Sequence, residues 1–286
     1  MMNAAPVEIR DSDRAKCTVY RDAPAWGERK TAAVGGFSCE SADAGSHLLH
    51  GVCDMLAREG FDAVIGPMDG DTWHKYRVVS ESDGSAPYFL EPVSGLYDHA
   101  AFTSAGFAPI SSYVSARANI DDAIGEPPKG IDGITITAWD GENAAALIGD
   151  LFNLSRSAFV NNAFYKPITR EAFLELYQPI IPAIDPRLVF FARAGDRLAG
   201  FLFAIPNLLE GARPRTGIVK TYASGVSGVG HMLIDRAHRT FRELGYTDVI
   251  HALMHVDNRS RDRSQRHQGS VFRRYDLMGG DLVRPL

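Results

Sequence analysis

The chain has 286 residues, of which 45% are hydrophobic and 23% charged, values typical of a folded globular protein. These values exclude a disordered, collagen-like or coiled-coil chain, and no run approaches the roughly 20 apolar residues of a membrane helix. The net charge of -5 is unevenly divided: residues 1–135 hold 11 Lys and Arg against 20 Asp and Glu, and the rest hold 19 against 15. We therefore expect no membrane partner and no nucleic acid, but a compact polyanion such as a nucleotide.

The N-terminal residues and the cysteines bear on the compartment. Residues 1–14 are polar and contain no apolar signal core. The three cysteines, Cys17, Cys39 and Cys53, are too few for a disulfide framework, and no pair has C-x-x-C spacing. We predict a reduced protein of the cytoplasm.

The first half alternates predicted strands and helices. Apolar patterning predicts strands at 33–39, 63–65 and 107–116, and helices at 44–58 and 97–105. The fold class predicted from this order is α/β (α+β), with a mixed sheet flanked by helices.

A linker rich in Pro and Gly at 125–130 divides the chain near its middle, because two prolines exclude helix and sheet pairing there. We predict one domain at 1–124 and a second at 131–286. The second is predicted to contain strands at 134–138, 188–192, 198–205, 217–223, 248–254 and 271–277, and helices at 140–159, from Thr169, up to Leu244 and at 258–267. The order of strands and helices in the later part of the second domain is repeated loosely in the first half. This repetition indicates that the two halves are diverged copies of one domain.

A glycine-rich segment, Gly225-x-x-Gly228-x-Gly230, lies between a predicted strand and an amphipathic helix. The first N–H groups of a helix have no intrahelical partner, and glycines let a phosphate approach them closely. A P-loop is excluded because His231 stands where its lysine is required, and Leu233 replaces the third glycine of a dinucleotide fold. A coenzyme A pyrophosphate loop and a plain flexible turn remain.

Two further groups of residues are candidates. Asp69, Asp71 and Trp73 follow a predicted strand and are candidate substrate-binding residues, with a carboxylate facing an ammonium group; the alternative is an ordinary loop with Asp71 as a cap and Trp73 packed inward. His251 and His255 lie on a predicted strand without an acidic third ligand, so we expect no metal site.

The second half resembles the GNAT superfamily, the CoA-dependent N-acetyltransferase-like acyltransferases. The family's loop is [QR]-x-x-G-x-[GA]; Gly228 and Gly230 match its small positions, and Gly225 stands where the family has Gln or Arg. Asn258 matches the asparagine that often opens the segment after the fifth strand. In many relatives a Tyr in the next helix protonates the departing thiolate, whereas residues 264–267 contain no Tyr.

The first half resembles the same superfamily loosely over residues 31–118. Its loop carries Glu40 and Asp43 where phosphate would bind. Like charges at such a site disfavour CoA phosphates by roughly 1 kcal/mol per close pair. The resemblance therefore implies two GNAT-like domains, of which the first is a degenerate copy.

The resemblance further implies that an acyl group moves from acetyl-CoA or another acyl-CoA to the amine of a small molecule by direct attack, without a metal. The implied CoA-binding residues are Tyr222, Ala223, Gly225, Val226, Ser227, Gly228, Val229, Gly230 and Asn258. The candidate bases are Tyr222, His251 and His255. Two alternatives stay open: a non-catalytic CoA-binding or interaction protein, and an acyltransferase that takes its acyl group from an acyl carrier protein.

Overall fold

One mixed sheet of 12 strands runs through residues 5–160 and 162–282, the part of the chain that the computed structural model describes. Its strands lie in the order β1-β2-β3-β4-β12-β6-β11-β10-β9-β8-β7, and β5 pairs with β12. The first-half strands are β1 (Val7–Asp11), β2 (Ala15–Tyr20), β3 (Thr31–Cys39), β4 (Ala63–Gly66), β5 (Val78–Ser82) and β6 (Ala108–Asn119). The second-half strands are β7 (Ile134–Ala138), β8 (Val189–Ala194), β9 (Arg197–Pro206), β10 (Thr216–Ser224), β11 (Asp248–His255) and β12 (Ser270–Asp281).

Helices cover both faces of the second-half sheet. Alternate residues of a strand point to opposite faces, so Phe190 of β8 packs with α6 whereas its neighbour Phe191 packs with α4. The helices are α1 (Ala42–Arg58), α2 (Asp98–Ser104), α3 (Ile120–Ala123), α4 (Ala144–Phe159), α5 (Arg170–Tyr177), α6 (Val229–Glu243) and α7 (Arg259–Arg266), with 3-10 turns at Gln178–Ala183, Pro186–Leu188 and Leu208–Glu210. None of the described helices is long and apolar enough to span a bilayer.

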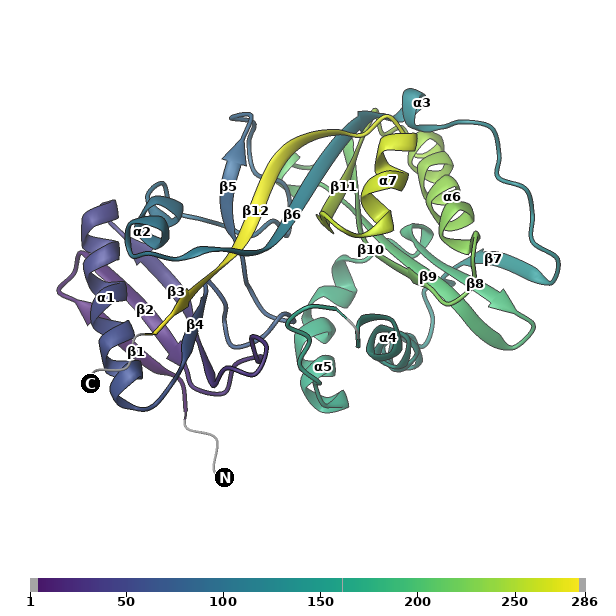
Figure 1. Cartoon of the computed structure of the whole chain (residues 1–286). Coiled ribbons are helices and arrows are strands. Elements are labelled where there is room, and N and C mark those ends of the chain that lie inside the picture. Colours follow the sequence, from purple (N-terminus) through teal and green to yellow (C-terminus); the bar gives the residue numbers. More distant parts are fainter. Residues whose placement is uncertain (1–4, 161, 283–286) are drawn as a thin grey trace.

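Two long strands join the halves. β12 pairs with β6 over Ser270–Gly279 and with β4 over Met278–Asp281, so the end of the chain returns to the first-half sheet. β6 in turn pairs with β11. In Figure 1, β12 can be followed in yellow from the second half into the first. The boundaries at 1–124 and 131–286 stay a prediction, since strands of both ranges interleave in this sheet.

Most elements lie where the sequence predicts them. The predicted helices at 44–58 and 97–105 and the strand at 217–223 correspond to α1, α2 and β10. The β1–β2 hairpin and β5 were not predicted. β1 and β5 are short and largely exposed, so they carry little of the apolar pattern on which strand prediction depends.

Candidate functional site

β10 and β11 diverge in the middle of the second-half sheet. They pair in parallel from Thr216↔Asp248 to Val219↔His251, and beyond that point each continues without the other as a partner. Both strands are irregular where the pairing ends: the register of β10 against β9 shifts between Val219 and Thr221, and Leu253 of β11 has a φ of 56°. These bulges bend the strands apart, and the glycine-rich loop follows the separated end of β10.

The N-terminus of α6 has free backbone donors. Gly228 is its N-cap, with a φ of 85° that favours glycine and no side-chain capping bond. Among the described residues, the N–H groups of Ser227, Gly228 and Gly230 have no hydrogen-bond partner. Three free N–H groups at the positive end of a 15-residue helix form a site suited to an anion.

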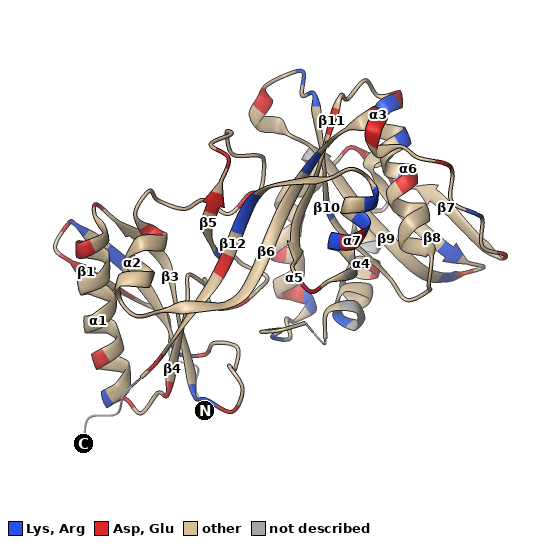
Figure 2. Ribbon diagram, turned by 45° about the horizontal axis from the view of Figure 1, so that its top comes forward, with Lys and Arg blue, Asp and Glu red and all other residues tan. Residues whose placement is uncertain are grey.

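Basic side chains of α7 gather at this helix end. A Cβ atom on Gly230 would lie 2.6 Å from Arg263 Nη1, so the Arg263 guanidinium lies against the first turn of α6. Arg263 Nη1 also donates to the Tyr222 hydroxyl at 3.3 Å, and Arg266 Nη1 lies 3.5 Å from His231 Nε2. Neither arginine forms an ion pair with a carboxylate of the described residues. Figure 2 marks the basic positions of α7 in blue beside α6.

The predicted CoA-binding residues therefore divide by environment. Gly225 and Ser227 are exposed, and Tyr222 reaches Arg263. Val229 is fully buried in the core, so only its backbone lies at the loop. The remaining predicted residues are Ala223, buried against α4; Val226, packed with the α6 core; Gly228 and Gly230, at the helix end; and Asn258, which caps α7 through its Oδ1.

The corresponding region of the first half is closed. β3 and β4 pair in parallel only from Thr31↔Ala63 to Ala33↔Ile65, and the chain after β4 fills the space beyond. Met68 N donates to Val34 O at 2.7 Å, and Gly36 N donates to Asp69 Oδ1 at 2.7 Å. Ser41 caps α1 with its own hydroxyl, which accepts from Ala44 N at 3.2 Å. This half consequently lacks the open helix end of the second.

Lys220 of β10 lies where β10 and β11 separate, on the face of the sheet opposite α6. Its Nζ donates to Leu90 O at 2.9 Å, within a segment whose Tyr88 and Phe89 pack on Ile218 and its neighbours. Burial and the nearby positive charge of Arg77 lower the pKa of Lys220 to about 7. With a pKa near 7, a substantial fraction of Lys220 is neutral at pH 7 and can accept a proton from a bound ligand.

A buried polar network lies next to Lys220. The carboxylate of Glu91 accepts from Arg273 Nη1 at 2.7 Å and from the Tyr275 hydroxyl. Tyr88 OH lies 2.8 Å from Ser115 Oγ and 3.2 Å from Tyr275 OH. Because burial raises the pKa of Tyr88 to about 12, its phenol stays protonated near pH 7. Arg273 thus belongs to this network rather than to the basic end of α6.

Both predicted histidine bases have engaged ring nitrogens. His251 is buried on the α6 side, with Nε2 at 2.9 Å from His238 Nε2 and Nδ1 at 2.7 Å from Ser264 Oγ. His255 is partly exposed; its Nδ1 accepts from Asp257 N and its Nε2 lies 3.2 Å from Ser111 Oγ. Neither ring has a nitrogen that is free to take a proton from a ligand in this structure.

The buried pair His238 and His251 predicts acid sensitivity. Burial lowers the pKa of His251 from 6.5 to about 3 and that of His238 well below 6.5. Below pH 6.5 the unfolded chain therefore binds protons that the folded chain does not, and the free energy of unfolding falls toward pH 3. We expect a fall of about 2 kcal/mol for the pair between pH 6.5 and 5.5, measured by urea unfolding. His251→Gln should remove about half of it and exposed His50→Gln none; an unchanged slope in His251→Gln would contradict this assignment.

The loop that carries Asp69, Asp71 and Trp73 leads directly into Arg77, and its three candidate side chains are engaged within the protein. Asp69 accepts from Gly36 N, and Asp71 Oδ1 accepts from Trp73 N at 2.8 Å. Trp73 donates from Nε1 to Lys166 O at 2.8 Å and packs on Phe159, Tyr165 and Phe173 of the second half. Their substrate role stays a prediction; in this structure the two carboxylates hold backbone groups and Trp73 joins the two halves.

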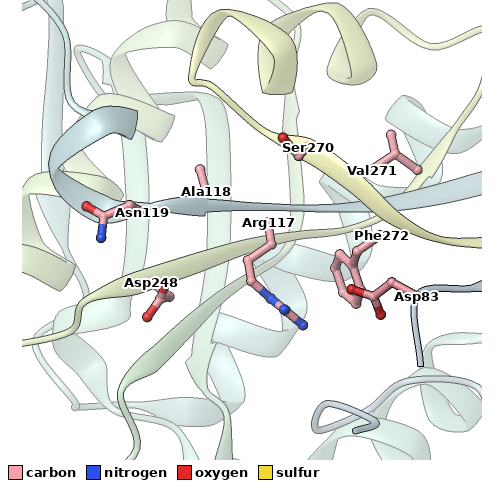
Figure 3. Close-up of a pocket in the computed structure, with 8 residues that line it drawn as sticks. All are labelled: Asp83, Arg117, Ala118, Asn119, Asp248, Ser270, Val271 and Phe272. Atoms are coloured by element: carbon pink, nitrogen blue, oxygen red, sulfur yellow. The ribbon is translucent and has the colours of Figure 1, made fainter. Parts of the chain in front are cut away.

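A surface pocket of about 320 Å³ lies at the opposite end of the diverging strands. Figure 3 shows its lining, with Arg117 between Asp248 and Asp83. Asp248 marks the start of the β10–β11 pairing, whereas the divergence begins after His251. Arg117 lies over the Phe272 ring at 4.4 Å and donates to Ser85 Oγ at 3.2 Å. The pocket is therefore separate from the glycine loop.

Sequence reasoning missed Lys220, Arg77 and Glu91. Lys220 had a usable signal, because it is a lysine in the otherwise uncharged strand Thr216–Ser224. Arg77 and Glu91 lie in irregular segments without a periodic pattern. Among the described residues, no group of three or more His, Cys, Asp or Glu is placed to hold a metal ion.

Comparison with known proteins finds solved structures with a similar fold. No family model and no curated protein sequence matches the chain. A GCN5-related N-acetyltransferase from Sphaerobacter thermophilus superposes with a TM-score of 0.58 at 14% identity, over 95% of this chain and 78% of that one. A tandem GNAT protein from the clavulanic acid biosynthesis pathway gives 0.55 at 13% identity, over 99% and 86%. A GCN5-related N-acetyltransferase from Anabaena variabilis gives 0.52 at 8% identity, over 94% and 60%.

These matches extend over nearly the whole chain, so they show its fold. Because the sequence identity is only 8–14%, they show the fold alone. The chain has the tandem GNAT fold, as the sequence predicted, in a mixed α/β arrangement.

Proposed function

We propose that this protein, which has the tandem GNAT fold, transfers an acyl group from acyl-CoA to the amine of a small molecule. The observation that carries the proposal is the α6 N-terminus, where three free N–H groups meet Arg263 and Arg266 without a carboxylate partner among the described residues. Guanidinium groups beside the positive end of a helix repel it unless an anion lies between them. The pyrophosphate of CoA supplies such an anion.

The donor set fits CoA despite the missing loop side chain. The GNAT loop carries Gln or Arg where this chain has Gly225, and Arg263 of α7 brings a guanidinium to the same helix end from another element. Arginine suits phosphate because its planar guanidinium donates several hydrogen bonds. In this proposal the free N–H groups and Arg263 hold the pyrophosphate, and the separated part of β10 lies along the pantetheine arm.

Lys220 is the proposed base. A primary amine attacks a thioester only in its neutral form, so the ammonium group of the acceptor must first lose a proton. Lys220 lies where β10 and β11 separate, on the face opposite α6, and its lowered pKa leaves much of it neutral near pH 7. Its Nζ takes the ammonium proton, and the neutral amine nitrogen attacks the thioester carbon. The nitrogen then loses its second proton to solvent as the carbon–sulfur bond breaks, which leaves a neutral amide and releases CoA thiolate.

Positioning accounts for the remaining rate enhancement. Holding the amine against the thioester is worth up to roughly 7 to 11 kcal/mol of the barrier. Residues 264–267, which correspond to the place of the family's tyrosine acid, contain no Tyr. We therefore expect solvent to protonate the departing thiolate.

Two measurements test this function. Release of free thiol from a panel of acyl-CoAs, with pooled amines and product identification by mass spectrometry, should show transfer of the acyl group to an amine. Calorimetry should give one CoA per chain, because the helix end of the first half is capped and closed. One bound CoA without any thiol release would favour the non-catalytic alternative, and absent CoA binding would favour a carrier-protein donor. Two bound CoA molecules would contradict the argument from the first half.

A further inference from the structure

A buried arginine, Arg77, has no acidic partner among the described residues. Its guanidinium carbon lies 3.8 Å from the centroid of the Tyr76 ring and 3.7 Å from that of the Tyr113 ring. Only 9% of the residue is exposed. Its Nε and Nη1 atoms have no hydrogen-bond partner, and no described carboxylate lies within ion-pair distance. Buried polar groups are nearly always paired, so these donors indicate a missing acceptor.

The backbone at Arg77 is held in an unusual conformation. Its φ of 84° lies in the left-handed region, which residues with a side chain rarely adopt. A hydrogen bond from Arg77 N to Pro67 O at 2.9 Å fixes this turn. Such conformations concentrate at ligand sites, where the surrounding structure over-determines them. The fold thus places the guanidinium between the two rings at a local cost.

The buried acids near Arg77 are already engaged by other groups. Glu91 accepts from Arg273, from Tyr275 and from Tyr88 N, and Asp276 accepts from Ser112 Oγ. Lys220 adds a further amine, and burial lowers the pKa of Arg77 only to about 10, so its guanidinium stays charged near pH 7. A buried charge without a counterion is unfavourable, and a bound anion removes that penalty.

Arg77 adjoins the proposed transfer site. Its positive charge lowers the pKa values of both Lys220 and His255. The Tyr113 ring that stacks on Arg77 also meets the His255 ring edge-on, with centroids 5.0 Å apart and planes at 89°. An anion bound to Arg77 would therefore lie on the same side of the diverging strands as the proposed base.

We propose that Arg77 binds the carboxylate of the acyl acceptor, so that the acceptor is an amino acid or a related amine bearing a carboxylate. This inference rests on the proposed function and narrows its substrate class. The oxygens of a carboxylate can accept from the unpaired Nε and Nη1 of the guanidinium, and its single charge balances that of Arg77. The carboxylate anchors the acceptor while its amine faces Lys220.

Matched acceptor pairs test the proposal on the full chain. The probes are the proteinogenic amino acids and their carboxamides, which differ only at the group that Arg77 would bind. With acetyl-CoA as donor, the best acid should exceed its amide at least tenfold in kcat/KM. Thermal-shift measurements without CoA should show stabilisation by that acid and not by its amide. Equal rates and equal shifts for acid and amide would overturn the inference without the use of any variant.

Two variants localise the effect. Arg77→Gln should reduce the acid-over-amide preference to below twofold while the Kd of CoA changes by less than twofold. Arg77→Met, which also lacks the charge and the donors, serves the same purpose if the glutamine variant does not fold. Arg117→Gln is the matched control, since Arg117 also lies over an aromatic ring but lines the separate pocket of Figure 3; it should keep the preference. A preference retained in Arg77→Gln would contradict the assignment. If no acceptor releases thiol, the proposed function fails, and the thermal shifts alone decide whether Arg77 binds a carboxylate.

Discussion

Lys220→Met is expected to lower kcat/KM with acyl-CoA and amine at pH 7 by about 10² to 10⁴-fold, the usual contribution of a general base. The physical reason is that methionine has a similar length but cannot accept the ammonium proton of the acceptor. The Kd of CoA should change by less than about threefold, because Lys220 lies on the face opposite the α6 N-terminus. Steady-state kinetics and calorimetry measure the two effects separately.

Lys220→Arg distinguishes a role of Lys220 as a base from a purely structural role as a cation. Arginine keeps the positive charge and a donor for Leu90 O but stays protonated at every accessible pH. It should therefore be as inactive as Lys220→Met. In the wild type, kcat/KM should rise with pH as Lys220 loses its proton, through an apparent pKa of about 7. Activity restored by arginine, or the same rise in Lys220→Met, would show that another group is the base.

Gly228→Glu is expected to weaken CoA binding at least hundredfold, or about 2.7 kcal/mol. Gly228 is the N-cap of α6, and its own N–H is one of the free donors. A glutamate there places a carboxylate beside the pyrophosphate and supplies the helix end with a negative charge of its own. Calorimetry with CoA measures the loss.

The backbone of Gly228 calls for a matched control. Any side chain is strained at its φ of 85°, and a new Cβ would lie 3.0 Å from Ile131 Cδ1. Gly106 has a similar φ of 83° with open space around it, and it lies in the first half, far along the chain from the loop. Gly106→Glu should lower the thermal stability through strain while leaving the CoA affinity unchanged. Unchanged CoA affinity in a folded Gly228→Glu variant would refute the loop assignment.

The loop and its helix could be recognised from sequence because their signals are local. Glycine spacing, the apolar face of the helix up to Leu244 and the preceding strand lie within one continuous segment, and α6 and β10 form where they predict. The first-half loop with Glu40 and Asp43 was likewise predicted to be degenerate, and the structure adds that Ser41 caps its helix and that Met68 and Asp69 close the strands beside it.

The roles of single polar residues were less predictable, because a side chain's partners depend on the whole fold. His251 was one of three candidate bases, but α6 and α7 bring His238 and Ser264 to its two ring nitrogens. Asp71 and Trp73 suggested a substrate wall, whereas the alternative of a capping aspartate and an inward-packed tryptophan describes their contacts.

The sequence by itself determined the fold class and the position of the glycine-rich loop before α6, since both depend on residue periodicity and on backbone freedom within short segments. Only the tertiary structure decided which charges face one another. Arg263 reaches the α6 end from a separate helix, and Arg77, Glu91 and Lys220 come from three distant segments to one side of the sheet. The crossing of β6 and β12 between the halves creates that neighbourhood, and the ionisation of a buried group depends on its neighbours in space and on its exclusion from water.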